Sequence, residues 1–171
     1  MSNPADEAPG PRPIAVIDID GVIADVRHRL QHVARTPKDW DAFFAAAPDD
    51  EVLAVGLETA RRLAEVCEIV YLSGRPEWCR KETLDWFDRH ALPPGELHLR
   101  PRNDRRPARV IKIEALDRLS ERAQVTVLVD DDPQVWAAAR DAGYDVLPAD
   151  WMGDRREQDV LFAAQEVEGR T

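Results

Sequence analysis

Short apolar runs alternate along the chain with longer segments in which apolar residues recur every three or four positions. The first run, Ile-Ala-Val-Ile at 14–17, ends abruptly in carboxylates, and similar runs rich in β-branched residues occupy 68–73 and 125–129. Runs of this length that end in polar or turn residues are typical of buried strands. Weaker strand candidates lie at 96–99 and 144–147. The pattern therefore predicts a sheet built mainly from buried strands.

The segments between these runs have the periodicity of amphipathic helices. Apolar stripes at 57–64, 110–119 and 135–142 each fall on one helix face. Strands that alternate with helices of this length predict βαβ units, and hence a three-layer, doubly wound α/β fold with a parallel sheet. In such a sheet the ligand crevice lies beyond the carboxyl ends of the strands.

Two prolines mark expected helix starts. Asp132 precedes Pro133 as an N-cap precedes proline at the first helical position, and Gly143 stands where that helix would end in a left-handed residue. Pro76 is expected to open a helix in the same way.

The chain is expected to form one domain over 13–171, after a lead-in at 1–12 whose Pro, Ala and acidic residues favour disorder. The stretch between the first two strands is longer than one crossover helix requires, so 24–50 is expected to form a small helical cap. Three aromatic residues of this cap either pack it onto the core or stack on a nucleic-acid base: Trp40, Phe43 and Phe44.

Charge and cysteine content restrict the function further. The 33 Asp and Glu against 23 Lys and Arg give a formal net charge of -10, which argues against nonspecific coating of nucleic acid or of an anionic membrane. Cys67 and Cys79 lack the paired spacing of a zinc or disulfide framework, which indicates a reducing compartment. Because the sequence shows neither a signal peptide nor a membrane span, we expect a cytoplasmic protein. The stretch 155–168 is expected to be helical, and nothing in it indicates a function.

Asp18 and Asp20 stand two residues apart at the end of the first strand. The two-residue period of a strand points both side chains to the same side, and Gly21 then lets the chain turn sharply. Two carboxylates this close need a cation between them or a proton on one of them. Taken alone, the pair is equally consistent with an acidic loop at a solvated strand end.

Other strand and helix ends that face the same crevice carry groups suited to a phosphate and a metal. Ser73 ends the second run and, with backbone N–H groups at a helix start, suits an oxyanion. Lys112 lies early in the next helix. Asp130 and Asp131 follow the run at 125–129, and ligands that are all oxygen favour a hard cation such as Mg²⁺. Taken singly, Ser73 is also an ordinary helix-start residue and Lys112 an ordinary surface lysine.

In this order, the candidate residues resemble the four motifs of the haloacid dehalogenase (HAD) superfamily of phosphatases, over about residues 14–150. The resemblance rests on these motifs: Asp18-Ile19-Asp20-Gly21-Val22, Leu72-Ser73-Gly74-Arg75, Lys112, and Val129-Asp130-Asp131.

The resemblance implies a Rossmann-like HAD fold and a role for each motif. Asp18 would be the nucleophile that forms an aspartyl phosphate, and Asp20 the general acid and base. Ser73 and Lys112 would bind the phosphoryl oxygens. The implied Mg²⁺ site consists of the Asp18 carboxylate, the backbone carbonyl of Asp20, and the pair Asp130 and Asp131.

Two related classes fit the motifs less well. A dehalogenase has no need of Asp20, because a halide leaving group takes no proton. A receiver domain also combines carboxylates, a hydroxyl and a lysine, but its acidic pair follows the first strand and its phosphoacceptor the third, which is the reverse of the order in this chain.

Within the superfamily, the spacing is most similar to the 3′-phosphatase domain of polynucleotide kinase-phosphatases. Three details carry the similarity: Arg29, nine residues after Asp20; the Ser-Gly-Arg run at 73–75; and Gln134-Val135 soon after the acidic pair. The similarity implies that Arg29, Gly74 and Arg75 contact the substrate. One position departs from it, because Ala108 stands where that family has an aspartate.

Five arginines crowd the residues just before Lys112 in a chain that is otherwise acidic: Arg100, Arg102, Arg105, Arg106 and Arg109. Beside a phosphate site such a cluster can bind neighbouring phosphates of an oligonucleotide, and Arg102, Arg105 and Arg106 are the substrate-binding candidates. The same arginines are equally explained as a solvated loop that pairs with the surplus Asp and Glu.

The sequence therefore predicts a Mg²⁺-dependent phosphomonoester hydrolase, most similar to enzymes that remove 3′ phosphates from DNA or RNA ends. One alternative is a 5′- or 3′-nucleotidase or small-metabolite phosphatase with the same catalytic residues. Another is a noncatalytic HAD-like binding module, against which the intact set of site residues argues. No phosphate loop of the form G-x-x-x-x-G-K-[ST] is present, so a kinase or ligase would be a separate partner, and no membrane partner is expected.

Overall fold

A computed structural model describes residues 10–153, 158, 159, 161–163 and 166, so most of the expected lead-in at 1–12 lies outside the described residues. Its centre is a sheet in the order β5-β4-β1-β6-β7, with every neighbouring pair parallel. The five runs predicted as strands all occur in it: β1 (Ile14–Ile17), β4 (Glu68–Pro76), β5 (Gly95–Arg100), β6 (Val125–Asp130) and β7 (Val146–Pro148).

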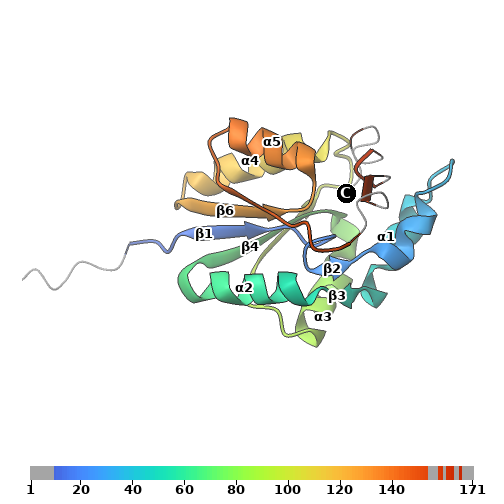
Figure 1. Cartoon of the computed structure of the whole chain (residues 1–171), viewed down its shortest axis with the longest axis horizontal. Helices are drawn as coiled ribbons and strands as arrows, with labels where there is room; N and C mark the ends of the chain where they lie inside the picture. The colour runs from blue at the N-terminus through green and yellow to red at the C-terminus, as the bar shows by residue number, and fades with distance from the viewer. Residues whose placement is uncertain (1–9, 154–157, 160, 164–165, 167–171) are drawn as a thin grey trace, which may run out of the picture.

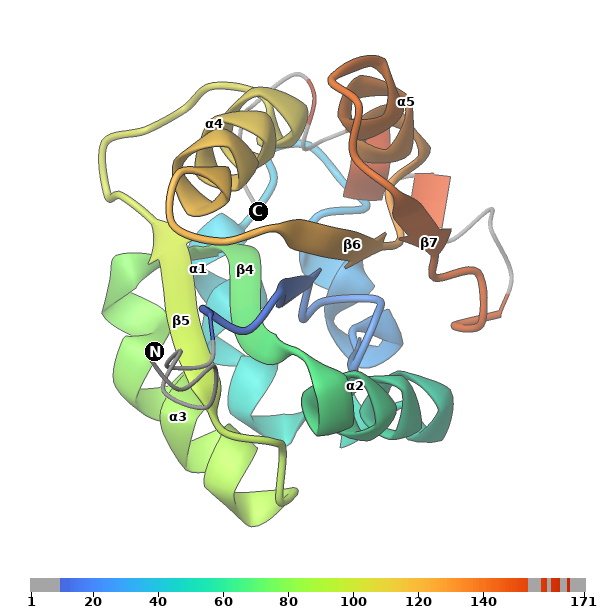
Figure 2. The same ribbon diagram turned by 90° about the vertical axis from the view of Figure 1, so that its left-hand side faces the viewer.

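Helices cover both faces of this sheet (Figure 1). On one face lie α4 (Ala108–Ser120) and α5 (Pro133–Asp141), and on the other lie α2 (Ala54–Val66) and α3 (Arg80–Arg89). Figure 2 shows the same layers from the side, with the sheet between the two pairs of helices. The predicted three-layer, doubly wound α/β fold is thereby confirmed.

Alternate residues of β1 enter two hydrophobic clusters on opposite faces of the sheet. Ile14 and Val16 pack in the cluster with α4 and α5, whereas Ala15 and Ile17 pack in the cluster with α2 and α3. None of the four has any exposed surface. Because both faces are covered, the strand reads as an unbroken apolar run, and this made it recognisable in the sequence.

The predicted ends of α5 are confirmed, but the predicted start of α3 is not. The Asp132 carboxylate accepts a hydrogen bond from the backbone N–H of Gln134 over 2.8 Å, and Gly143 follows the helix with a φ of 89°. Pro76, in contrast, still belongs to β4 and has a ψ of 152°, which is extended. A 3₁₀ turn at Glu77–Cys79 follows before α3 begins.

The chain between β1 and α2 forms a small cap beyond the carboxyl ends of the strands (Figure 1). Its base is an antiparallel pair of two-residue strands, which the sequence pattern did not predict. The strands enclose three short helical elements. In chain order the cap consists of β2 (Ala24–Asp25), η1 (Arg27–His32), α1 (Trp40–Ala45), η2 (Ala47–Asp49) and β3 (Glu51–Val52).

Aromatic side chains hold this cap together. Trp40 stacks on Phe44 with ring centroids 6.0 Å apart and meets Phe43 edge-on. Met152 and Leu161, from the C-terminal part of the chain, join the same hydrophobic cluster. Packing within the molecule, rather than stacking on a ligand, therefore accounts for Trp40 and Phe43, which are almost fully buried.

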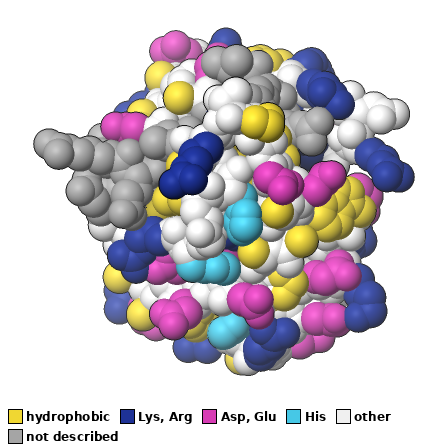
Figure 3. Space-filling view, turned by 90° about the vertical axis from the view of Figure 1, so that its right-hand side faces the viewer, with side chains coloured by type: hydrophobic (Ala, Val, Ile, Leu, Met, Phe, Trp, Pro, Cys, Tyr) yellow, Lys and Arg dark blue, Asp and Glu magenta, His cyan; other side chains and the backbone are white. Residues whose placement is uncertain are grey.

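On the face that carries the cap, acidic and basic side chains are interspersed with one another (Figure 3). The negative net charge of the chain is therefore not gathered into one acidic surface on this side. In the part of the chain that the structure describes, no helix combines the length and the apolar composition needed to cross a membrane.

Candidate active site

Asp18 and Asp20 leave the carboxyl end of β1 and enter one small pocket. The backbone N–H of Asp18 still bonds to the carbonyl of Val129 in β6 over 2.9 Å, and Gly21 then turns the chain with a φ of 77°. Both residues are almost fully buried. Residues from all four predicted motifs line the pocket: Asp18, Asp20, Ser73, Gly74, Lys112, Asp131 and Asp132.

Lys112, which lines this pocket, reaches from α4 to two buried carboxylates. Its Nζ donates to Oδ2 of Asp18 over 2.8 Å and to Oδ2 of Asp130 over 2.6 Å. Burial alone would lower the pKa of Lys112, but Asp130 and Asp18 outweigh it, so the pKa lies above its ordinary value and the amine stays charged. Lys112 is only 5% exposed, so the alternative of an ordinary surface lysine is excluded.

Three carboxylates are placed so that one cation could join them. One oxygen from each of Asp18, Asp130 and Asp131 lies within 4.8 Å of the others. A Cβ at position 21 would lie 2.0 Å from Oδ2 of Asp131, so a glycine at this position leaves room for that carboxylate and a larger residue would clash with it. Because the donor atoms are all carboxylate oxygens, the set fits a hard cation such as Mg²⁺.

The charges of this cluster also fit a bound cation. Burial raises the pKa of Asp18 to about 7, with Lys112 opposing the rise and Asp130 adding to it. Burial, and then the charges of Asp18 and Asp130, raise the pKa of Asp131 well above its ordinary value. Burial raises the pKa of Asp130 as well. One lysine cannot neutralise three buried carboxylates, and a divalent cation would offset their mutual repulsion.

Two buried arginines hold Asp20. Arg29, from the cap, and Arg75, from β4, place Nη2 2.7 Å and 2.6 Å from Oδ1 of Asp20. Burial raises the pKa of Asp20, but the two guanidinium groups outweigh burial and hold the pKa below its ordinary value. The other oxygen, Oδ2, is buried and has no hydrogen-bond partner among the described residues. Asp20 is therefore a carboxylate that is fixed at one oxygen and free at the other.

Asp50 completes this network from the end of the cap. Its Oδ2 accepts from Nη2 of Arg29 over 2.8 Å and from Nη2 of Arg75 over 3.0 Å. Its backbone carbonyl accepts from Nε1 of Trp86 in α3 over 2.9 Å. The cap is thus joined to Asp20 through charged groups. Sequence reasoning missed Asp50, because a carboxylate in an acidic loop has no periodicity or motif that distinguishes it.

Ser73 and Gly74 lie in the extended end of β4, and not at the helix start expected from the sequence. The Ser73 hydroxyl lines the pocket and accepts a hydrogen bond from the backbone N–H of Arg75 over 3.2 Å. A phosphate in the pocket would therefore meet a hydroxyl and extended backbone rather than the first turn of a helix.

The three substrate-binding candidates of the arginine cluster differ in their contacts. Arg102 and Arg105 are exposed and line a larger pocket next to the first, and the structure shows no salt bridge to either within its described residues. Arg106 is paired with Asp104 and Glu114 and does not line either pocket. The positions of Arg102 and Arg105 thus fit the interpretation that they bind phosphate. Arg106 fits the other interpretation, in which an exposed arginine pairs with acidic residues.

A buried glutamine from the C-terminal part of the chain also reaches the site. Nε2 of Gln158 donates to Oδ2 of Asp131 over 3.1 Å. It belongs to the stretch 155–168, of which only part is described, and nothing in the sequence distinguished it. Ala108, where the similar domains have an aspartate, packs in the core with Leu116 and supplies no carboxylate.

A family model matches the sequence of this chain, and solved structures share its fold. Residues 12–151 match the family described as the polynucleotide kinase PNKP phosphatase domain. The match covers most of the chain and includes every candidate site residue from Asp18 to Asp131. No curated protein matches the chain in sequence.

Among solved structures, a chain of the Pnkp1/Rnl/Hen1 RNA repair complex has a TM-score of 0.65 and 20% identity, over 86% of this chain and 46% of that one. A chain of another Pnkp1/Rnl/Hen1 complex has a TM-score of 0.64 and 22% identity, over 86% and 50%. The haloacid dehalogenase-like hydrolase SP0104 from Streptococcus pneumoniae has a TM-score of 0.53 and 10% identity, over 87% and 90%. The chain thus spans about half the length of the first two.

Proposed function

The chain belongs to the family of the polynucleotide kinase PNKP phosphatase domain, within the HAD superfamily of phosphatases, and from this membership we propose a Mg²⁺-dependent 3′-phosphatase of polynucleotide ends. It acts through an aspartyl-phosphate intermediate. One observation carries the proposal: the Asp18 carboxylate accepts from Lys112 and lies within 4.8 Å of carboxylate oxygens of Asp130 and Asp131, in a pocket that Asp20 and Ser73 also line.

Asp18 is the nucleophile. An oxygen of its carboxylate attacks phosphorus, the bond between phosphorus and the ester oxygen breaks, and the phosphoryl group passes to Asp18. A phosphomonoester dianion repels a carboxylate, so its charge must be neutralised before attack. The Lys112 amine, already 2.8 Å from Asp18, and the Ser73 hydroxyl bind the phosphoryl oxygens at this point.

Asp20 moves the proton in both steps. It gives a proton to the departing ester oxygen, and afterwards takes one from the water that attacks phosphorus and releases inorganic phosphate and Asp18. Oδ2 is the oxygen available for this exchange, because Arg29 and Arg75 occupy Oδ1. The two arginines favour the carboxylate form, and a bound phosphate dianion next to Asp20 favours the protonated form. Substrate binding thus prepares the acid.

The metal fits the residues that are present. A Mg²⁺ ion held by Asp18, Asp130 and Asp131 would neutralise charge on the transferred phosphoryl group. The backbone carbonyl of Asp20 is the proposed further ligand. The carboxylate of Asp20 does not belong to the three-carboxylate cluster. Arg29 and Arg75 bind it instead.

The polynucleotide end is favoured as substrate because the catalytic pocket continues into a second one. Gly74 lines both, and the second pocket contains Arg102 and Arg105. Arginines next to a phosphate site can bind the further phosphates of a chain. The likeness to chains of an RNA repair complex supports the same substrate class.

Substrate competition tests the proposal. We expect kcat/KM for 3′-phosphorylated oligonucleotides, one of DNA and one of RNA, to exceed that for 3′- and 5′-nucleoside monophosphates and for a sugar phosphate by at least about 10-fold, or about 1.4 kcal/mol. A nucleotide or sugar phosphate that surpasses both oligonucleotides would establish the nucleotidase or metabolite alternative. Binding of oligonucleotide without hydrolysis of any ester would establish the noncatalytic one.

A kinase or ligase is proposed as a partner in end processing. The two Pnkp1/Rnl/Hen1 structures are complexes, and the present chain corresponds to about half of each matched chain. Because the sequence contains no kinase phosphate loop, 5′-end chemistry would come from another polypeptide segment or chain. Co-purification of a tagged protein with an oligonucleotide-ligase or kinase activity is the expected result.

A further inference from the structure

The first turn of α4 carries an arginine that is bound by the C-terminal part of the chain. Nε and Nη2 of Arg109 lie 3.1 Å and 3.0 Å from Oε1 of Glu166, which comes 57 positions later in the sequence. Arg106, by contrast, pairs with Asp104 and Glu114, which are close to it in the sequence. A distant segment, and not its own loop, therefore supplies the carboxylate that binds Arg109.

This ion pair lies close to the catalytic pocket. Arg109 precedes Lys112 by three positions on α4, so the two side chains are neighbours on one face of the helix. Burial raises the pKa of Asp132, and the negative charge of Glu166 adds to the rise. Because Asp132 lines the catalytic pocket, the Glu166 carboxylate stands within electrostatic reach of that pocket.

The same C-terminal part of the chain has two buried anchors. Gln158 donates to Asp131 over 3.1 Å, and Leu161 packs in the hydrophobic cluster of the cap. The ion pair of Glu166 is instead partly exposed, with 42% of the Arg109 side chain and 30% of the Glu166 side chain accessible. Exposed ion pairs are weak. Another anion can therefore replace Glu166 on Arg109 without breaking either anchor.

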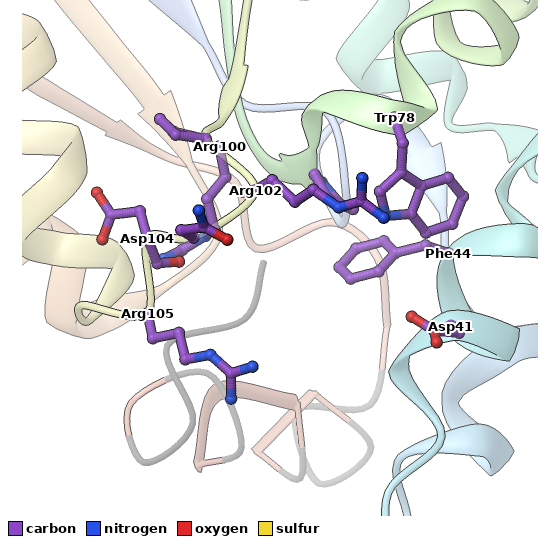
Figure 4. A pocket seen from close by; sticks show the side chains of 11 residues that line it. Asp41, Phe44, Trp78, Arg100, Arg102, Asp104 and Arg105 are labelled. Carbon is purple, nitrogen blue, oxygen red and sulfur yellow. The ribbon is translucent and has the colours of Figure 1, made fainter.

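Two further arginines stand in the loop that leads into α4. Arg102 and Arg105 line an open pocket of about 320 Å³, shown in Figure 4, and Gly74 lines both this pocket and the catalytic one. Neither arginine forms a salt bridge within the described residues. Along the chain, Arg109 lies between these two arginines and Lys112. The phosphodiesters of a polynucleotide are the groups that such arginines bind.

We propose that Arg109 binds a phosphodiester of the substrate strand, and that Glu166 occupies Arg109 as an internal competitor before the strand binds. The proposal rests on the proposed function, which supplies the polynucleotide. Nε and Nη2 form one edge of the guanidinium group, the edge that suits a carboxylate or a phosphate equally well. A phosphodiester that uses this edge must first displace Glu166.

The competitor acts most on the product. A strand that has lost its 3′ phosphate no longer contacts the catalytic pocket through that group, and its phosphodiesters remain as the anionic groups that bind the protein. Return of Glu166 to Arg109 removes one of these contacts. The ion pair therefore favours release of the product, and it leaves esters without a phosphodiester unaffected.

Binding of the product strand tests the competition without catalysis. The probe is a fluorescent oligonucleotide with a 3′-hydroxyl end, and anisotropy measures its Kd. We expect Glu166→Gln, which keeps the length and removes the charge, to lower Kd by about 2- to 5-fold, the range for one exposed ion pair. Arg109→Gln should raise Kd and reduce the slope of log Kd against log salt concentration by about 0.7, because one phosphate contact is lost.

The double variant shows whether Glu166 acts through Arg109. In the Arg109→Gln background, Glu166→Gln should leave Kd unchanged, because the group for which it competes is gone. If Glu166→Gln lowers Kd equally in both backgrounds, Glu166 repels the strand at a distance and the proposal is wrong. A rise in Kd would show that Glu166 positions Arg109 for the strand, which also overturns the proposal.

A second ion pair provides a matched control. Glu68 binds Arg122 over 3.0 Å, and the two side chains are 46% and 42% exposed. Glu68 begins β4, so it lies at the edge of the sheet opposite the catalytic pocket. We expect Glu68→Gln to leave Kd unchanged. In activity assays, Glu166→Gln should raise kcat/KM for a 3′-phosphorylated oligonucleotide and leave that for a nucleoside 3′-monophosphate, which has no phosphodiester, as it is.

The outcomes separate this inference from the proposed function. If the wild-type protein hydrolyses nucleoside monophosphates but no oligonucleotide, the proposed function and the inference both fail. If it hydrolyses the oligonucleotide, and Glu166→Gln changes neither Kd nor kcat/KM, only the inference fails. A gain that appears with the oligonucleotide alone, and only where Arg109 is present, supports both.

Discussion

Arg29 and Arg75 converge on the same oxygen of Asp20, although one belongs to the cap and the other to the central sheet. Both guanidinium groups are almost inaccessible to solvent, and both also bind Asp50. Two arginines and two carboxylates therefore form a buried network next to the catalytic pocket. The network orients Oδ2 of Asp20 and at the same time attaches the cap to the sheet.

Removal of one arginine from this network should destabilise the protein strongly. Arg75→Met keeps the side-chain volume but leaves Asp20 and Asp50 with a single buried partner, so we expect the free energy of unfolding to fall by about 3–5 kcal/mol. Urea denaturation measures this free energy of unfolding. Arg62→Ala is the control, because Arg62 pairs with Glu58 on the exposed face of α2, and its loss should stay within about 0.5 kcal/mol. Equal losses for the two variants would show that the buried network adds nothing to stability.

Asp18→Asn should abolish hydrolysis while leaving the fold intact. The amide is nearly isosteric with the carboxylate but is no nucleophile, so no covalent intermediate can form. Mass spectrometry of acid-quenched wild-type protein is expected to show a phosphoryl adduct on the peptide that contains Asp18, and the variant should show none. Turnover by the variant at a rate near that of the wild type would contradict the assignment of Asp18 as nucleophile.

Asp20→Asn should affect poor leaving groups most. An alkoxide needs a proton to depart, whereas nitrophenolate is stable without one, so loss of the acid should lower kcat for an alkyl phosphate by roughly 10²- to 10⁴-fold. The expected loss for nitrophenyl phosphate is at least tenfold smaller. Pre-steady-state kinetics with both esters measures the first step directly. Equal losses for the two esters would mean that Asp20 does not donate the proton.

The strands, the helices that cover them and four separate motifs were predictable because each has a local signature. β1 is a buried apolar run that ends in Asp18, and Asp132 with Pro133 marks the start of α5. The order of the motifs along a doubly wound sheet then brought Asp18, Lys112 and Asp130 together. Such predictions need only the period of the hydrophobic positions along the chain and the direction of the strands in the sheet.

The contacts between distant segments had no such signature. Asp50 meets Arg75 only because the cap folds back over the sheet, and Gln158 meets Asp131 only because the C-terminal part of the chain returns to the same edge. Nothing in the sequence distinguished Trp78, and its exposed position follows from the extended path of β4 through Pro76. The position of these residues depends on the tertiary structure and not on local spacing.

Gln158 should tune the metal site through Asp131. Its amide donates to Oδ2, so it restricts the orientation of a carboxylate in the three-carboxylate cluster. Gln158→Met, which keeps the length without the hydrogen bond, is expected to raise the Mg²⁺ concentration for half-maximal activity by about 10-fold or more. The same increase should appear for Mn²⁺ binding followed by calorimetry in the absence of substrate. An unchanged metal affinity would assign Gln158 to packing alone.

Two glycines offer a matched pair for testing the metal site itself. Gly21 and Gly143 both have a positive φ, 77° and 89°, so alanine at either position introduces similar backbone strain of about 1–2 kcal/mol. Only at position 21 does the new Cβ meet a carboxylate, 2.0 Å from Oδ2 of Asp131, whereas position 143 has no atom within 4 Å. We therefore expect both variants to lose stability in urea, and Gly21→Ala alone to lose metal affinity.

Thermal unfolding with added Mg²⁺ measures this difference. Wild-type protein and Gly143→Ala should gain thermal stability as Mg²⁺ is added, because a ligand that binds the native state stabilises it. This gain should be reduced or absent in Gly21→Ala. A full Mg²⁺ response in Gly21→Ala would place the ion elsewhere than beside Asp131.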